Sequence, residues 1–310
     1  MSIKGIEKLV FGVESLSESR RFLQDFGLTE QAGTDGGLLF TTLDGSEIRV
    51  YPRAAAPLPP AFEDGSTLRS VTWGVESAQA LQSLAARLQD EPGFASSEDL
   101  VTCRDPGGMT LEFRLSTVSE IELEVPPINQ HGDIRRINRA SPVYERATPI
   151  GIGHVVFFVT DLARARAFYE QKLGFHLSDF YRGKGAFMRA SEAGPHHHLF
   201  LLHIPGHAPG LNHVAFTVRD IHEVAGGGLA MNRKGWSTFL GPGRHPISSA
   251  YFWYVNSPLG GAFEYYSNDD YLTGEWQPRE LEHSVASFTE WAVEGGIDPQ
   301  TRRQHEAVGA

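Results

Sequence analysis

The chain has 310 residues, enough for two domains, and its 41% hydrophobic and 21% charged residues are typical of a globular protein with a packed core. Its net charge of −11 argues against nucleic acid and against an anionic membrane surface as partners. The single cysteine, Cys103, excludes an internal disulfide framework and a CxxC metal site. We expect a cytoplasmic protein with no leader peptide and no transmembrane helix.

The N-terminal strand and helix are repeated in the second half of the chain. Residues 5–22, GIEKLVFGVESLSESRRF, and residues 151–168, GIGHVVFFVTDLARARAF, are identical at 8 of 18 positions when shifted by 146. Each copy reads as an alternating strand, a short polar turn and a helical segment that ends at Gly27 or Gly174. Asp161 is a candidate N-cap for the second of these helices.

A second strand-and-helix pattern starts in each half, at residues 70 and 213, and each half closes with a turn and a strand, DPGGMTLE and SPLGGAFE. We therefore expect an α+β fold of four modules, two per domain, in which each module is a strand, a helix and further strands in a curved mixed sheet. The boundaries that we expect are an N-terminal module pair at 1–120, a linker at 121–148, a C-terminal catalytic pair at 149–270 and a polar tail at 271–310, with one possible helix at 284–294.

Three potential metal ligands occupy corresponding places in the modules of the second half. Since side chains alternate along a strand, we expect His154, His213 and Glu264 on the face opposite the apolar residues that pack against helices. Two imidazoles and one carboxylate on neighbouring strands form a facial triad, which leaves open positions on a non-haem Fe(II) ion. A single strand histidine is more often structural than ligating, so the coincidence of all three favours a metal site.

The first half lacks this ligand set. Lys8 stands at the place of His154 and Ser70 at the place of His213, while Glu112 corresponds to Glu264. A lysine is protonated near neutral pH and is a poor metal ligand. We therefore expect the N-terminal pair to keep the fold without the metal.

The duplicated module resembles the vicinal oxygen chelate superfamily, and the two-domain length with an active C-terminal half resembles its type I extradiol ring-cleavage dioxygenases. The closing signature of that family is a His, a Tyr, a Pro-x-Gly turn and the ligand Glu. Residues 243–264, GRHPISSAYFWYVNSPLGGAFE, follow it, with departures at Trp253 and Ser257. The resemblance implies four βαβββ modules in two tandem domains, each a sheet curved into a cup.

The same resemblance implies the chemistry. A catechol-type aromatic diol would be cleaved by O₂ beside its two hydroxyl carbons at Fe(II), giving a muconic semialdehyde-type product, with Mn(II) as a possible replacement for iron. His154, His213 and Glu264 match the metal ligands. His245 matches a histidine beside the substrate, and Tyr254 matches a tyrosine that hydrogen-bonds the bound phenolate.

The run HHHLFLL at 196–202 resembles the family strand that supplies a catalytic histidine. The family register assigns this role to His198, and His197 would then face the opposite way. Phe187 is our candidate among the aromatic residues that could line the substrate pocket.

Two other functions are compatible with the pattern. One is a different vicinal oxygen chelate metalloenzyme, namely an isomerase, epimerase or glutathione lyase, which usually has a fourth protein ligand where this chain has Lys8 or Ser70. The other is a non-catalytic module that binds a planar aromatic compound. The exposed sheet edges and the habit of the family favour a homo-oligomer.

Overall fold

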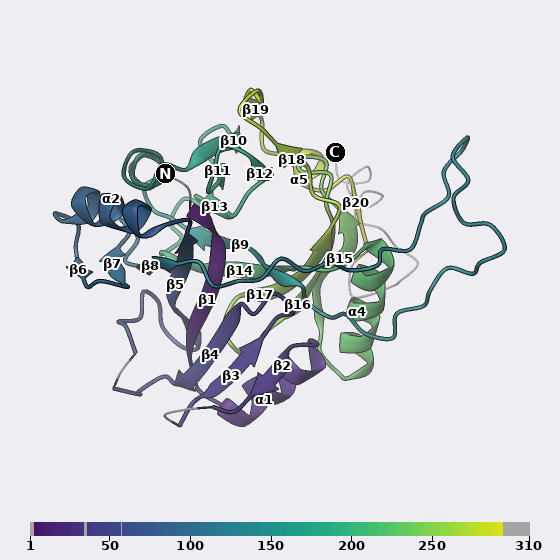
Figure 1. The fold of residues 1–310 in the computed structure, drawn as a ribbon, viewed down its shortest axis with the longest axis horizontal. Coiled ribbons are helices and arrows are strands. Elements are labelled where there is room, and N and C mark those ends of the chain that lie inside the picture. The colour runs from purple at the N-terminus through teal and green to yellow at the C-terminus, as the bar shows by residue number, and fades with distance from the viewer. Residues whose placement is uncertain (1–2, 34–35, 57, 294–310) are drawn as a thin grey trace.

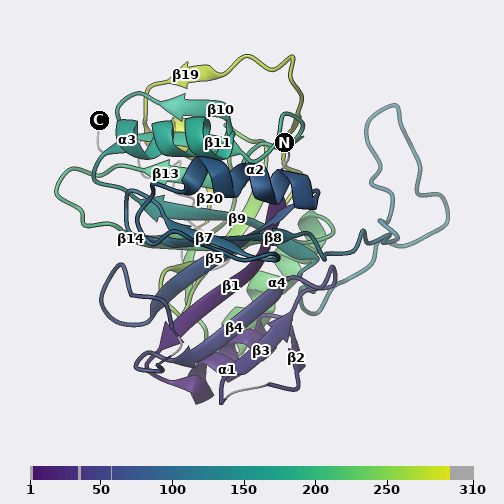
Figure 2. The ribbon, with the colours of Figure 1, turned by 60° about the vertical axis from the view of Figure 1, so that its left-hand side comes forward.

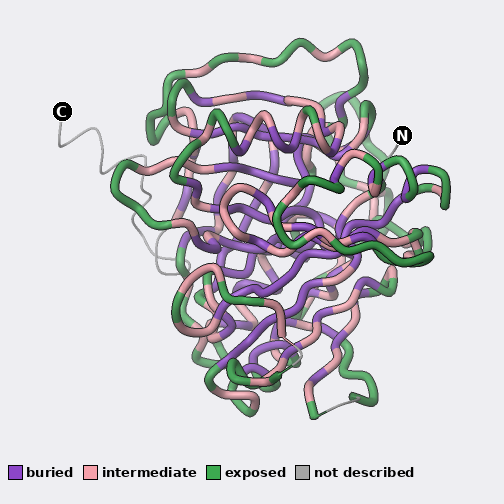
Figure 3. Tube along the Cα trace, turned by 90° about the vertical axis from the view of Figure 1, so that its left-hand side faces the viewer, coloured by how far each residue is buried: buried purple, intermediate pink, exposed green. Residues whose placement is uncertain are grey.

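Two mixed β-sheets, one from each half of the chain, form the body of the molecule, with helices packed beside them (Figure 1). The structure is a computed structural model that describes residues 3–33, 36–56 and 58–293. The buried stretches of the trace follow the strands of both sheets, while the exposed stretches lie in the peripheral loops (Figure 3). Within the described residues, no helix is long and apolar enough to cross a membrane.

The N-terminal sheet consists of two modules with the order strand, helix and three strands. The first module is β1 (Ile3–Val13), α1 (Leu16–Asp25), β2 (Thr29–Gln31), β3 (Leu38–Thr41) and β4 (Glu47–Pro52). The second is β5 (Thr67–Val75), α2 (Ala78–Leu88), β6 (Ala95–Ser96), β7 (Val101–Arg104) and β8 (Thr110–Leu115). The sheet order is β2-β3-β4-β1-β5-β8-β7-β6, so the leading strands of the two modules pair antiparallel at its centre.

The C-terminal sheet repeats this arrangement. Its first module is β9 (Gly151–Phe158), α3 (Leu162–Ala167) with the π-helical η1 (Phe168–Leu173), β10 (His176–Tyr181), β11 (Gly185–Arg189) and β13 (Leu199–Leu202). The short β12 (Gly194–Pro195) between β11 and β13 lies outside this sheet and pairs with a strand after β17. Its second is β14 (Gly210–Thr217), α4 (Ile221–Arg233), β15 (Thr238–Arg244), β16 (Tyr251–Asn256) and β17 (Ala262–Ser267). The leading strands β9 and β14 again pair antiparallel at the centre. The predicted fold of four βαβββ modules in two tandem sheets is therefore confirmed.

The segment after β17 belongs to the fold, although we expected a tail there. Its elements are β18 (Tyr271–Leu272), β19 (Arg279–Leu281), α5 (Val285–Phe288) and β20 (Trp291–Ala292). The C-terminal sheet gains β19 at one edge, beside β10, and β20 at the other, beside β15. Strands of two or three residues are too short to show a periodic pattern, which is why the sequence did not reveal them. Residues 294–310 of the predicted tail lie outside the described residues.

The predicted helix at 284–294 shrinks to the single turn of α5. Ser284 and Ser287 form a capping box at its start, and Thr289 already has an extended backbone. The earlier N-cap prediction is confirmed, because the Asp161 side chain accepts a hydrogen bond from the Arg164 backbone N–H.

The two halves share one hydrophobic core, because the first helix packs against the back of the second sheet. The Phe26 ring stacks on Tyr265 of β17 with 4.0 Å between ring centroids, and the Tyr265 hydroxyl donates a 2.8 Å hydrogen bond to the Phe26 carbonyl oxygen. Phe22 of α1 meets Phe263 edge-on at 5.2 Å. The N-terminal half and α4 thus both pack on the apolar face of the C-terminal sheet, and its other face is left for the site.

Residues 116–150 connect the halves, and their middle part forms an arm that stands away from the body in two views (Figures 1 and 2). Within this arm, an isolated β-bridge pairs Gln130 with Asp133. Several large apolar side chains on it are exposed to solvent, namely Val125, Ile128, Ile134, Ile137 and Val143.

Candidate metal centre and substrate cavity

The three predicted ligands lie on three adjacent strands in the middle of the C-terminal sheet. Ala215 of β14 is opposite His154 of β9 on one side and opposite Glu264 of β17 on the other. His213 is two residues before Ala215, so it faces the same side of the sheet. The small methyl group of Ala215 leaves space between the flanking imidazole and carboxylate, and all three polar side chains are buried.

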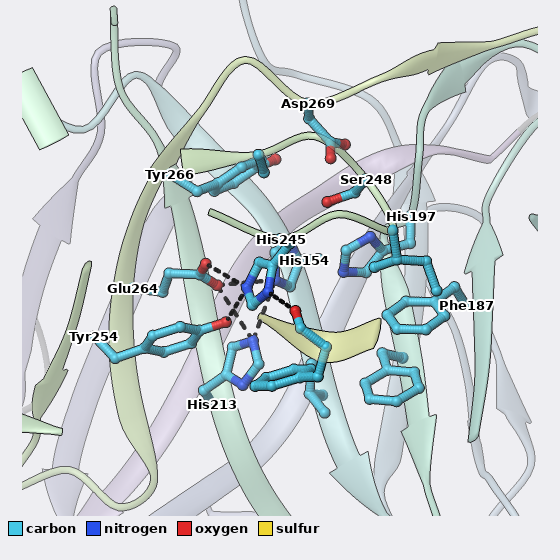
Figure 4. A pocket seen from close by; sticks show the side chains of 15 residues that line it. His154, Phe187, His197, His213, His245, Ser248, Tyr254, Glu264, Tyr266 and Asp269 are labelled. Carbon is cyan, nitrogen blue, oxygen red and sulfur yellow. Dashed lines mark hydrogen bonds and ion pairs between the residues drawn. The ribbon is translucent and has the colours of Figure 1, made fainter. Parts of the chain in front are cut away.

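Three ligand atoms converge within hydrogen-bonding distance of one another (Figure 4). His154 Nε2 is 3.2 Å from His213 Nε2 and 3.1 Å from Glu264 Oε2, and His213 Nε2 is 3.3 Å from the same oxygen. Octahedral bonds of about 2.1 Å place adjacent ligand atoms about 3 Å apart, so the triangle fits one face of such a polyhedron. Among the described residues, this is the group of three or more potential ligands that could hold a metal ion.

The surroundings prepare these atoms to act as ligands. His213 Nδ1 is 2.6 Å from Asn212 Oδ1, an acceptor, so Nδ1 donates to Asn212 and Nε2 is the nitrogen turned toward the other two ligands. Burial lowers the pKa of His154 despite the neighbouring carboxylate, which favours a neutral ring. Burial opposes ionisation of Glu264, but the two imidazoles that face it, His154 and His213, outweigh this effect and hold the pKa of Glu264 well below its usual range. Two neutral imidazoles and one carboxylate are what a divalent metal requires.

The corresponding place in the N-terminal sheet holds an ion pair. Lys8 Nζ of β1 is 2.8 Å from Glu112 Oε2 of β8, and the Thr72 hydroxyl donates a 2.6 Å hydrogen bond to the same oxygen. Burial opposes the charge on Glu112, yet Lys8 brings the pKa of the carboxyl below its ordinary value. An ammonium group therefore compensates this carboxylate, where in the second half we expect a metal to do so.

His245 and Tyr254 form a hydrogen-bonded pair beside the triad. His245 Nδ1 donates to the Phe288 carbonyl oxygen at 2.8 Å, and His245 Nε2 is 3.0 Å from the Tyr254 hydroxyl. Burial lowers the pKa of His245 to about 4, so its ring is neutral at pH 7 and Tyr254 donates to Nε2. Phe288 lies on α5, so the segment after β17 fixes the tautomer of a predicted site residue.

The structure places His197, and not His198, in the cavity. His197 lines the cavity, and its ring centroid is 4.1 Å from that of His154. The His198 ring lies on the other side, against Gly5 of β1, and its Nδ1 accepts a hydrogen bond from the Ala190 backbone N–H at 3.1 Å.

The predicted position of His198 is wrong because strict alternation does not extend to it. The chain bends at His198, and β13 begins only at Leu199. Phe200 and His197 consequently line the same cavity although they are three residues apart. Burial and the neighbouring imidazoles hold the pKa of His197 well below its ordinary value, which keeps the ring neutral.

Two adjoining spaces make up the cavity, and Figure 4 shows the side chains that line the inner one. The inner space, among the triad, His197, His245 and Tyr254, has about 20 Å³, enough for a metal-bound water but too small for an aromatic ring. The outer space has about 400 Å³. His213 and Tyr254 belong to the linings of both, so a ring in the outer space would lie next to the triad.

The predicted pocket residue Phe187 lines the inner space, where it stacks on Phe200 at 3.9 Å between ring centroids. The outer lining is mostly apolar, with Lys184 and His283 among its few polar members. Its apolar members are Tyr181, Phe200, Leu202, Ile204, Phe239, Leu240, Val285 and Phe288. A pocket of this size and polarity is suited to a small aromatic molecule with an apolar substituent.

Comparison with known proteins places this chain beside ring-cleaving enzymes. Residues 151–265 match the family described as Glyoxalase/Bleomycin resistance protein/Dioxygenase superfamily. Metapyrocatechase 2 of Cupriavidus necator is 29% identical over 87% of this chain and 83% of its own length. The iron-dependent extradiol dioxygenase of Rhodococcus jostii (strain RHA1) is 26% identical over 86% of this chain and 89% of its own. The Mn(II)-bound glyoxalase from Novosphingobium aromaticivorans shares the fold, with a TM-score of 0.74 at 19% identity over 96% of this chain and 95% of that one.

Proposed function

The chain belongs to the extradiol dioxygenase branch of the glyoxalase, bleomycin resistance protein and dioxygenase superfamily, and we propose that it cleaves a catechol-type aromatic diol with O₂. The cleaved bond lies beside the two hydroxyl carbons, so the product is of the muconic semialdehyde type. The observation that carries this proposal is the buried facial triad, whose open side meets a cavity with a neutral histidine and a tyrosine.

We propose Fe(II) as the metal and His154, His213 and Glu264 as its ligands. When bound, the ion would supply adjacent open positions for the two oxygens of a diol and for O₂. The comparisons include a protein named as iron-dependent and one solved with Mn(II), and the same ligand types suit both ions. Iron is preferred here because the proposed reaction activates O₂.

His197 takes the acid–base role that the family register predicts for His198. A neutral imidazole at the cavity can accept the proton of a diol hydroxyl and later return it to the oxidised substrate. The Tyr254 hydroxyl can turn from His245 Nε2 to donate to the deprotonated substrate oxygen, while His245 holds the tyrosine in place. Phe187 and Phe200 supply an apolar wall beside the reacting ring.

The outer space favours a diol with a bulky apolar substituent. At about 400 Å³ it exceeds what a single aromatic ring needs, and its lining is mainly aliphatic and aromatic. Water would remain in this space beside unsubstituted catechol. We therefore expect a substituted catechol to have a higher kcat/KM than catechol, through burial of apolar surface worth about 25 cal/mol per Å².

The test is oxygen consumption by the anaerobically iron-loaded protein with catechol and with catechols that carry alkyl or aryl substituents. We expect one O₂ consumed per diol and the appearance of the semialdehyde absorbance. Glu264→Gln is the matched control, because it keeps the side-chain shape but loses the charged ligand. Wild-type protein that binds iron stoichiometrically but consumes no O₂ with any of these diols would refute the proposal and favour an isomerase, lyase or aromatic-binding module. The manganese-loaded protein, assayed in parallel, distinguishes the two metals.

We also propose that the protein is a homo-oligomer, in which the arm between the halves packs against a second copy. The exposed Ile137 and Val143 support this, because exposed apolar side chains gathered on one projecting segment mark contact surfaces. The double substitution Ile137→Ser/Val143→Ser should lower the mass measured by light scattering, whereas Leu100→Ser, an exposed apolar residue outside the arm, should not. A monomeric wild-type protein would contradict the proposal.

We also propose a cytoplasmic location, and the single buried Cys103, which forms no disulfide, fits it.

A further inference from the structure

A chain of buried polar groups extends from the cavity to the edge of the C-terminal sheet behind His197. His197 Nδ1 is 3.2 Å from His196 Nδ1, and His196 Nε2 is 2.9 Å from Asp179 Oδ2. Arg279 reaches the same carboxylate with its backbone N–H at 2.7 Å and with guanidinium Nε at 3.1 Å. Both histidines and Asp179 are buried, so water does not mediate these contacts.

The Asp179 carboxylate determines which nitrogen of His196 carries a proton. Burial opposes the charge on Asp179, but hydrogen bonds from His196 and Arg279 outweigh it and bring the pKa of the carboxyl below its ordinary value. An ionised carboxylate only accepts hydrogen bonds, so His196 Nε2 must carry a proton and donate it to Asp179.

The contacts of His196 assign the roles of its two ring nitrogens. Nε2 donates to the carboxylate of Asp179, which Arg279 also contacts. The His196 backbone N–H donates to Asp269 at 2.9 Å, so Asp269 occupies neither ring nitrogen. In the tautomer with its proton on Nε2, His196 has a lone pair on Nδ1, which is then the acceptor in the pair with His197.

This leaves one arrangement for the catalytic candidate. Since His196 Nδ1 accepts, His197 Nδ1 must be protonated and donate to it. In the tautomer of His197 that carries this one ring proton, the lone pair lies on Nε2, which has no hydrogen-bond partner among the described residues. A lone pair on the free nitrogen of a cavity residue is what a general base requires.

We propose that Asp179 and His196 are positioning residues, which hold His197 as the tautomer with its proton on Nδ1 and its lone pair on Nε2. The use of this tautomer in catalysis rests on the proposed dioxygenase function, whereas the tautomer itself can be measured without turnover. Arg279 belongs to β19, so the short strand after β17 supplies the cation that keeps the chain of groups in this state.

The decisive variant is Asp179→Asn. In this variant an amide oxygen at the place of Oδ1 still accepts from the Arg279 backbone N–H and Nε, and the NH₂ group takes the place of Oδ2, which faces His196 Nε2 and Arg279 Nη2. The Arg279 side chain must then turn its Nη2 away, His196 Nε2 becomes the acceptor, and His196 Nδ1 becomes protonated. His196 would then donate to His197 Nδ1, which moves the proton of His197 to Nε2 and removes the lone pair from that nitrogen. The matched control is Glu280→Gln, because Glu280 of β19 pairs with Arg182, which directly follows β10, rather than with Asp179 or the histidines.

The primary measurement is the ¹⁵N spectrum of ¹⁵N-histidine-labelled protein loaded with diamagnetic Zn²⁺, in which protonated and unprotonated ring nitrogens differ strongly in shift. The His197 signals are those that disappear in His197→Asn. We expect Nδ1–H in the wild type and in Glu280→Gln, and Nε2–H in Asp179→Asn.

The second measurement is steady-state kinetics of the iron-loaded variants. In Asp179→Asn, kcat should fall by about 10²–10⁴, the usual contribution of a positioned base, while KM and iron content stay within about threefold of the wild type. Nε2–H in the wild type, or an unchanged tautomer in folded Asp179→Asn, would overturn the proposal. If Asp179→Asn does not fold, the wild-type spectrum still decides it. Failure of the dioxygenase function alone would appear as the expected tautomer without O₂ consumption.

Discussion

Replacing His197 and His198 separately with asparagine tests which of the two neighbours acts on the substrate. In His197→Asn, the amide nitrogen can occupy the place of Nδ1 and still donate to His196, but no atom reaches the place of Nε2. The variant thus removes the proposed base and keeps the contact behind it. We expect kcat to fall by about 10²–10⁴, which corresponds to about 3–5 kcal/mol of transition-state stabilisation.

His198→Asn is the matched control, because it makes the same substitution at a residue outside the cavity. In His198→Asn, the amide oxygen can accept the hydrogen bond from the Ala190 N–H that Nδ1 now accepts. The rest of the ring is lost from its contacts with Gly5 and Gly194, which should cost about 1–2 kcal/mol of unfolding free energy. We expect kcat within about threefold of the wild type.

The assay is steady-state O₂ uptake by both variants, after iron content has been matched and substrate affinity measured separately. Because His197 is not one of the three metal ligands, His197→Asn should retain iron. A large loss of kcat in His198→Asn together with near-normal turnover in His197→Asn would refute the assignment based on cavity position. Loss of iron from His197→Asn would show that this residue acts on the metal rather than on the substrate.

The remaining predictions concern the metal and the two halves. Alanine at any one of the proposed ligands should abolish stoichiometric iron, as metal analysis would show; these ligands are His154, His213 and Glu264. Lys8→Met should lower the unfolding free energy by about 2–4 kcal/mol, because it leaves the buried Glu112 carboxylate without its cation. The double variant Lys8→Met/Glu112→Gln should recover most of this loss. If it does not, loss of the ion pair is not the cause of the destabilisation. Burial raises the pKa of Asp105 to about 6 from its model-compound value of 3.8, so its stabilising contribution is complete below about pH 4 and is lost as the pH rises to about 6. The difference in unfolding free energy between the wild type and Asp105→Asn should therefore fall by about 2–3 kcal/mol over that interval in denaturant titrations, and a constant difference would contradict the shifted pKa.

The duplicated pattern was sufficient to predict the architecture and the triad. A repeat of strand and helix with regular alternation determines which face of each strand is apolar, and the face that remains must hold the polar residues. His154, His213 and Glu264 lie within strands, and counting by twos placed them on one face although the pairing of β14 with β9 shifts register beside His213. Ser257 departs from the family signature at the final turn, yet its hydroxyl accepts a hydrogen bond from the Leu259 N–H and holds the turn.

Alternation failed where the backbone is not a regular strand. At His196–His198 the chain bends before β13, and no local pattern in HHHLFLL indicates that bend. The contacts behind His197 were equally hidden, because Asp179 and Arg279 are 100 residues apart in the sequence and meet only through the pairing of β10 with β19. One weak signal was present in the sequence, since three successive histidines are more than one catalytic role requires.

The stacking of Phe26 on Tyr265 connects the N-terminal half, which lacks the ligand triad, to the strand that carries Glu264. Glu264 and Tyr265 are consecutive on β17, one facing the cavity and the other facing the N-terminal helix α1. Any displacement of α1 would thus be transmitted through a single peptide unit to a proposed metal ligand. The N-terminal half thus supports the position of a proposed metal ligand in the C-terminal half. Selection on catalysis therefore extends to residues that never approach the substrate.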